Sequence, residues 1–267
     1  MMALLRSELR RATSRRLVRL LLVAAVVGIA AGAVITAVDS KAPPPGTLAA
    51  ARAEYGFAVT QLPDVVLGSS FLVIIAGWLL GASFAGAEWH AGTMATLLTW
   101  EPRRTRVLAA KVVATAAVVA ALALVVLILM SLSLWLVAAT RGITEGAGEG
   151  FVADLAGAIS RVAAAAVVAS LIGLSIAMIG RNTSAGLGIG FAYLGVVEGL
   201  IRGLRPSWTP FLFGENVAVF VSGDPEQLGA FPDFVTRTVA GGALVAVVYA
   251  VTLLFAAGWS FRARDVN

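Results

Sequence analysis

The residues of this sequence whose types could support chemistry are concentrated in one polar stretch, residues 87–111, which separates two long apolar runs. His90 is the single histidine and the chain has no cysteine, so His90 lacks the partners that a metal site needs. A catalytic serine or threonine needs a general base beside it, and His90 lies in a different layer from any serine in the apolar runs. We therefore expect no catalytic residue and no metal ligand, and we do not expect this chain to be an enzyme.

Nucleotide binding through a P-loop is also excluded by the sequence. That motif needs a lysine followed by Ser or Thr after a glycine-rich turn. The two lysines are Lys41, followed by Ala42, and Lys111, followed by Val112. If this chain does work driven by ATP, a separate polypeptide must hydrolyse the nucleotide.

The composition indicates a multi-pass membrane protein. Hydrophobic residues make up 59% of the chain, charged residues 13%, and the mean hydropathy is +0.92. Runs of about 20 apolar residues are long enough to cross a hydrocarbon core of about 30 Å as helices. We predict an all-α protein with six spans, at residues 20–38, 65–87, 107–139, 162–179, 184–201 and 239–261.

The arginines predict the orientation of these spans. Most basic residues lie before the first span, between the second and third, and after the sixth, whereas most acidic residues lie in the alternate segments. The positive-inside rule then places both termini and the 87–111 stretch in the cytoplasm. The net charge of +5 is explained by the anionic lipid surface, so no nucleic-acid partner is expected.

Two further segments are predicted to lie at the membrane surfaces. Residues 1–19 place apolar side chains at helical spacing with arginines on other faces, which favours an amphipathic interfacial helix, although these arginines also serve as topology signals. Residues 202–237 are long and apolar, which favours a re-entrant segment over an ordinary outer loop. Residues 20–267 would then form a single transmembrane domain.

Within the polar stretch, a short helix parallel to the membrane is predicted. Gly92 and Thr93 can open it, with Thr93 as a possible cap, Met94 and Leu97 form part of an apolar stripe, and Pro102 ends it. The charged residues around it, including Glu88, have an alternative interpretation as solvated loop charges or topology signals.

The polar stretch resembles the loop between the second and third spans of type-2 ATP-binding-cassette (ABC) permeases. The residues that carry the resemblance are Glu88, Gly92, Thr93, Leu97, Leu98, Pro102, Arg106 and Lys111. The predicted topology is similar to that family as well. The resemblance implies that residues 88–99 form a coupling helix that docks on an ABC ATPase subunit, with ATP and Mg²⁺ bound by that subunit and not by this chain. The residues expected at this contact are Glu88, His90, Gly92, Thr93, Leu97, Arg103, Arg104 and Arg106.

The resemblance further implies an exporter subunit in a bacterial cell membrane, paired with a second copy or a sister permease. Small residues recur at every fourth position, which permits close helix approach. The residues expected at the pairing interface or along a path for an apolar or amphipathic substrate are Gly186, Gly190, Gly195, Gly199, Glu198 and Arg161.

Two other classes remain open from the residues alone. An ion-coupled secondary transporter would bury acids in its spans, and Glu198 is the one acid inside a predicted span. Arg202 follows four residues later, so we expect the two to form an ion pair. A structural or regulatory membrane subunit is the other alternative.

Overall fold

The computed structural model describes residues 2–41, 56–145, 147–224 and 238–264, and the described residues are almost entirely helical. Among the described residues, β-pairing is limited to an isolated bridge between Ala58 and Ile143. Within these ranges, six helical segments are long and apolar enough to cross a membrane, which confirms the prediction of an all-α, multi-pass membrane protein.

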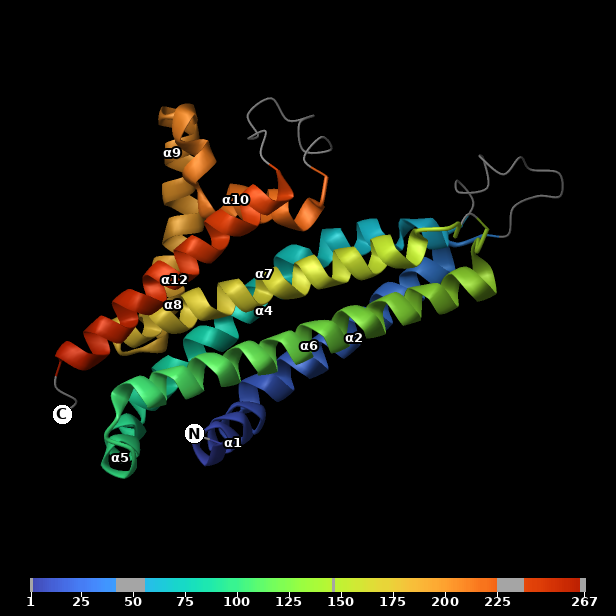
Figure 1. Cartoon of the computed structure of the whole chain (residues 1–267). Coiled ribbons are helices and arrows are strands. Elements are labelled where there is room, and N and C mark those ends of the chain that lie inside the picture. Colours follow the sequence, from blue (N-terminus) through green and yellow to red (C-terminus); the bar gives the residue numbers. More distant parts are fainter. Residues whose placement is uncertain (1, 42–55, 146, 225–237, 265–267) are drawn as a thin grey trace.

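The helices follow one another along the chain with short connections. The elements are α1 (Met2–Thr13), α2 (Arg16–Asp39), η1 (Val59–Gln61), α4 (Leu62–His90), α5 (Thr93–Trp100), α6 (Arg104–Arg141), α7 (Phe151–Gly180), α8 (Thr183–Ala192), η2 (Tyr193–Val197), α9 (Glu198–Leu204), η3 (Pro206–Phe211), α10 (Phe213–Ser222) and α12 (Val239–Ala263). Figure 1 shows α1, α5 and the last turn of α12 at one end of the molecule, which we name the α5 end.

The predicted spans match these helices, with two differences. Helix α7, which contains the fourth predicted span, begins at Phe151, well before the predicted start of that span at residue 162. The fifth span is not one regular helix, because a π-helical turn, η2, joins α8 to α9. Hydropathy marks apolar residues and not backbone hydrogen bonds. It therefore revealed neither the part of α7 that precedes the apolar run nor the π-helical turn.

The helix pair α4 and α7 forms the centre of the bundle. A Cβ added at Gly77 would overlap the carbonyl oxygen of Ala166, and one added at Gly81 would overlap that of Ser170. The backbones of the two helices therefore touch directly, which is the arrangement that small residues permit in membranes. These glycines form a contact within the chain.

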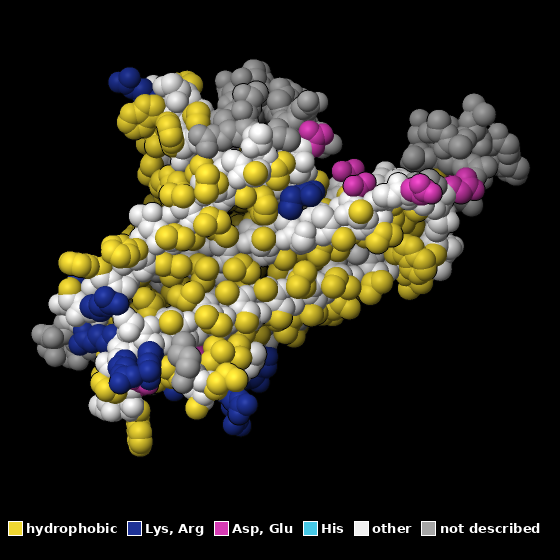
Figure 2. Space-filling view, in the orientation of Figure 1, with side chains coloured by type: hydrophobic (Ala, Val, Ile, Leu, Met, Phe, Trp, Pro, Cys, Tyr) yellow, Lys and Arg dark blue, Asp and Glu magenta, His cyan; other side chains and the backbone are white. Residues whose placement is uncertain are grey.

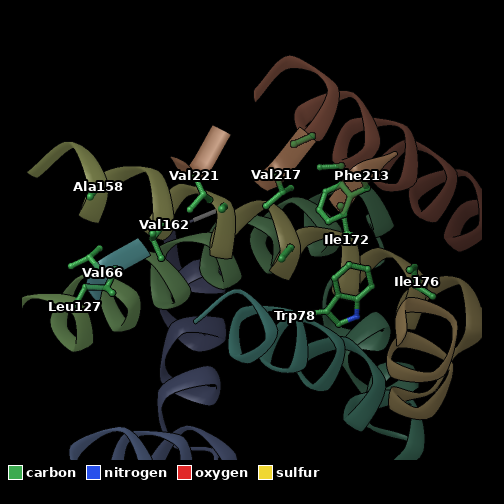
Figure 3. Close-up of a cluster of buried hydrophobic side chains, with 14 residues drawn as sticks. Val66, Trp78, Leu127, Ala158, Val162, Ile172, Ile176, Phe213, Val217 and Val221 are labelled. Atoms are coloured by element: carbon green, nitrogen blue, oxygen red, sulfur yellow. The ribbon is translucent and has the colours of Figure 1, made fainter. Parts of the chain in front are cut away.

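Apolar side chains from α4, α6, α7, α10 and α12 complete the core (Figure 3). Trp78 of α4 meets Phe213 of α10 edge to face, with ring centroids 6.4 Å apart. The Trp78 indole N–H donates to the carbonyl oxygen of Gly186 at 2.9 Å, so the one polar atom of this ring is satisfied.

The segment after α9 packs against the bundle. Phe213, Val217 and Val221 of α10 are buried in the same core, against α7 and α12. Residues 202–222 of the predicted re-entrant segment thus form η3, α10 and the last turn of α9, whereas residues 225–237 lie outside the described residues. The depth of this segment in a membrane stays a prediction.

Helix α2 is the least embedded of the long helices. Of its residues, all of which the structure describes, Val18 alone is buried. Figure 1 shows α2 running along α6 at the edge of the bundle, and its contacts with α4 are few. Apart from Arg16, Arg19 and Asp39 near its ends, its exposed side chains are apolar, as expected for a helix that faces lipid.

The glycine contact between α4 and α7 can be tested with a matched pair of substitutions. We expect Gly81→Ala to lower the free energy of unfolding by about 1–3 kcal/mol, because the new methyl group forces the two backbones apart. Gly68→Ala in the same helix is the control, because a Cβ there meets nothing within 4 Å. Thermal unfolding of the two variants in detergent is the measurement, and equal stability would contradict the assigned contact.

Candidate functional site

Helix α5 lies between the last residue of α4 and the first of α6, at the end where basic side chains gather (Figure 2). Gly92 makes the turn into it with a φ of 67°, a conformation that residues with a Cβ rarely adopt. The prediction that Thr93 caps the helix is wrong. The N-cap residue is Gly92, and Thr93 is the first helical residue, whose hydroxyl donates to the carbonyl oxygen of Glu88 at 3.3 Å. The helix ends before Pro102, as predicted.

One face of α5 is fixed in the bundle and the other is open. Met94 and Leu97 are buried, in a cluster with Leu174 of α7 and Phe261 of α12. Ala95, Thr96 and Thr99 are exposed, and Trp100, the last residue of the helix, is 85% exposed. The predicted contact residues that are also exposed are His90, Gly92, Thr93, Arg103 and Arg106.

Behind α5, a buried group of charges joins three helices. Lys111 of α6 is 2% exposed, and its Nζ lies 2.5 Å from Oε2 of Glu88 on α4 and 2.9 Å from Oε2 of Glu8 on α1. Both glutamates are themselves buried. Glu88 is therefore not a solvated loop charge, and the alternative interpretation fails for this residue.

Two arginines complete the group, which we name the Lys111 network. Arg15 lies 3.3 Å from Glu88, and Arg11 lies 3.3 Å from Glu8. Arg15 also donates to the carbonyl oxygens of Ser83 at 2.8 Å and Phe84 at 3.3 Å, and its guanidinium group lies 5.4 Å from the centre of the Phe84 ring. Burial lowers the pKa of Arg15 from its ordinary value, and the charge of Glu88 partly offsets this.

The network fixes α1 to the rest of the protein. Charges removed from water are costly unless each has a partner, and removing one partner of such a pair costs about 3–5 kcal/mol. Because Lys111 is shared by two carboxylates, α1 and α4 are both held to α6 through one ammonium group. The position of α1 therefore depends on the helices on both sides of α5.

Arg104, the first residue of α6, contacts the C-terminal end of α12. Its Nη1 donates to the carbonyl oxygens of Phe261 at 2.7 Å, Arg262 at 3.2 Å and Arg264 at 2.7 Å, at the end of α12. A cation is favourable at a helix C-terminus, where carbonyl groups lack partners. Arg104 therefore has a role in joining α6 to α12, whereas Arg106 makes a longer ion pair with Glu101 at 3.9 Å.

The predicted pair of Glu198 and Arg202 is wrong. The carboxylate of Glu198 accepts from the backbone N–H of Gly214, at 2.9 Å and 3.2 Å, while Arg202 pairs with Glu215 of α10. The N-terminus of α10 offers backbone donors and a positive dipole end, and it draws the carboxylate of Glu198 instead. Sequence spacing within one helix could not reveal this contact between elements.

The other predicted interface residues divide into two groups. Gly186 packs against Ala82 and Ala177, and Gly190 against the ring of Trp78, so both lie at contacts within the chain. A Cβ added at Gly195 or Gly199 meets nothing within 4 Å, so their face is open. Arg161 donates through Nε to the carbonyl oxygen of Val221 at 3.1 Å, which attaches α7 to α10.

Glu8 is the functional candidate that the sequence analysis did not select. It is the one acidic residue among the first 38, in a segment rich in arginine. A single acid among many basic residues was the feature of the sequence that could have pointed to an ion pair there. Among the described residues, no three His, Asp or Glu side chains lie close enough together to hold a metal ion.

Comparisons with known proteins do not assign the chain to a family. No family model matches this sequence, and no curated protein matches it. The functional argument therefore rests on the site itself.

The Lys111 network generates a prediction about stability. We expect Lys111→Met to lower the free energy of unfolding by about 3–5 kcal/mol, because two buried carboxylates lose their shared partner. Arg106→Met is the control, since its ion pair is half exposed and such pairs contribute at most about 1 kcal/mol. Thermal unfolding in detergent compares the two variants, and a loss no larger for Lys111→Met would refute the role of the network.

Proposed function

We propose that this protein is the membrane-spanning permease subunit of a type-2 ABC exporter in the plasma membrane, driven by ATP that separate ATPase subunits hydrolyse. The observation that carries the proposal is the construction of α5. It is a short helix between two long apolar helices, with one face buried and the other exposed. A surface of this kind suits a soluble partner that pushes on the membrane helices.

The distribution of charge supports a cytoplasmic position for α5. Lys and Arg side chains gather at the α5 end, and Asp and Glu side chains at the opposite end (Figure 2). The positive-inside rule then favours a cytoplasmic location for α1, α5 and the end of α12.

The connections of α5 support a mechanical role. Glu88 and Thr93 lie on the two sides of the turn that enters the helix, and Arg104 lies just after it. Through the Lys111 network and the contacts of Arg104, a force on α5 would reach α1, α4, α6 and α12 together. Nucleotide-driven movement of a docked ATPase would in this way tilt several spans at once.

A paired arrangement belongs to the same proposal. The open faces of Gly195 and Gly199, in the fifth span, suit the close approach of a helix from a second copy or a sister permease. The described spans present mostly apolar surface, so the cargo that we propose is apolar or amphipathic.

An ion-coupled transporter is the second candidate, and one observation favours it. Glu198 and Glu215 are both buried, at 4% and 2% exposure; Glu215 pairs with Arg202, whereas Glu198 accepts from the backbone N–H of Gly214. Buried acids at membrane depth are typical of proton and sodium pathways.

The docking surface can be tested by co-purification with an ATPase. We expect Trp100→Ala to weaken the association about tenfold, because exposed tryptophans commonly act as anchors of interfaces. Arg103→Glu tests the charged edge of the same surface, and Arg205→Glu, an exposed arginine beyond α9, is its control. The readout is the amount of P-loop protein recovered with the chain from native membranes by mass spectrometry. Recovery of no such protein with the unaltered chain would overturn the proposal.

Neutralising Glu198 separates the two candidate functions. In an ATP-driven exporter, Glu198→Gln keeps a carbonyl oxygen that accepts from the Gly214 N–H, so we expect transport to be reduced only modestly. In a proton-coupled transporter the same substitution abolishes transport. Uptake or export by vesicles, with and without a proton gradient, distinguishes these outcomes.

A further inference from the structure

A hollow lies between α2, α4 and α6. Its volume is about 650 Å³, within the range of sites that hold small ligands. Along α2 its lining extends from Val18 to Thr36, about 27 Å of helix at 1.5 Å per residue. This length approaches the hydrocarbon thickness of a bilayer, about 30 Å. The hollow is therefore long and narrow, and it follows the direction of the spans.

The lining of the hollow is almost wholly hydrocarbon. Among the described residues that form it, Thr36 and Ser69 alone have polar side chains. The Ser69 hydroxyl already donates to the carbonyl oxygen of Val66 at 2.8 Å. A ligand with buried donors or acceptors would leave them without partners, at a cost in affinity. The part of a ligand that enters must therefore be a long apolar chain.

Glycines on α2 give the hollow its depth. A Cβ added at Gly28 or Gly32 meets nothing within 4 Å, and both residues belong to the lining. The absence of side chains at these positions leaves space between α2 and the helix pair α4 and α6.

The two ends of α2 carry opposite charges. Its first turn has Arg16 and Arg19, both exposed, on either side of Val18, the first residue of α2 that lines the hollow. At the other end α2 finishes at Asp39, which is also exposed. An anionic group attached to an apolar chain is thus attracted to the end with the arginines and repelled from the other.

We propose that this hollow binds the acyl chains of an anionic phospholipid whose phosphate group lies at Arg16 and Arg19. The lipid comes from the leaflet at the α5 end, and its chains extend along α2 between α4 and α6. This inference goes beyond the proposed function and does not require it, because binding of a lipid needs neither the ATPase nor transport.

The site is tested on the full chain in lipid nanodiscs of phosphatidylcholine with a minor fraction of a phosphatidylglycerol analogue that carries a diazirine on one acyl chain. After illumination, mass spectrometry locates the labelled residues. We expect labels to concentrate on residues that line the hollow, such as Val73, Val119 and Val126. Equal labelling of the exposed apolar face of α12, such as Val251 and Phe255, would show bulk lipid only and would overturn the proposal.

Filling the hollow gives a second measurement. In Gly32→Trp the new side chain enters open space, so we expect labelling of the hollow to fall to the level of α12. Gly188→Trp in α8 is the matched control, because a Cβ there also meets nothing within 4 Å and Gly188 does not line the hollow. A loss of labelling with both variants, or with neither, would contradict the assigned site.

The headgroup is tested by comparing the phosphatidylglycerol probe with a phosphatidylcholine probe of the same chain. We expect Arg16→Gln and Arg19→Gln each to lower the preference for the anionic probe about fivefold, since a basic residue near the membrane surface contributes about 1 kcal/mol. Arg205→Gln, beyond α9, should leave the preference unchanged. An unchanged preference in the first two variants would refute the position of the phosphate group.

Discussion

The direct contact between the backbones of α4 and α7 is the constraint on which the rest of the structure depends. Gly77 and Gly81 allow α4 to approach α7 so closely that no side chain fits between them. Lipid tails are as apolar as the side chains, so moving an apolar side chain from lipid to a helix interface yields little free energy. The association of helices in a membrane therefore depends on close packing. The other helices are arranged around this pair: α6, α10 and α12 pack on α7, and α8 packs on both.

The molecule uses a different kind of contact at the α5 end. There the Lys111 network holds α1 with charges whose cost of burial is offset only when every partner is present. The glycines bring the backbones of two helices into contact, whereas a shared ammonium group links three helices at one point. The bundle therefore combines a closely packed centre with a charged joint beside the helix proposed to meet a partner.

The sequence was sufficient for the helices and for their approximate limits, because membrane thickness sets the length of an apolar run and Pro102 and Gly92 mark the limits of α5. It was insufficient for contacts between elements. The pairing of Lys111 with Glu8 joins residues far apart in the chain, and the capping of α10 by Glu198 depends on how α10 folds back. Spacing within one helix predicted Arg202 as the ion-pair partner of Glu198. It contains no information about a backbone N–H group from another helix, such as that of Gly214.

The π-helical turn η2 determines which way Glu198 points. In an uninterrupted α-helix each residue advances by about 100°, so Glu198 would lie roughly 80° around the axis from Gly190. A π turn has its hydrogen bonds one residue further apart, and this extra residue turns the following helix back by about 100°. Glu198 is thereby brought close to the inward face that Gly190 shares with Trp78. Removing one residue from η2 would shorten the span by a single residue and hardly change its hydropathy, yet it would turn Glu198 by about 100°, away from the face that Gly190 shares with Trp78.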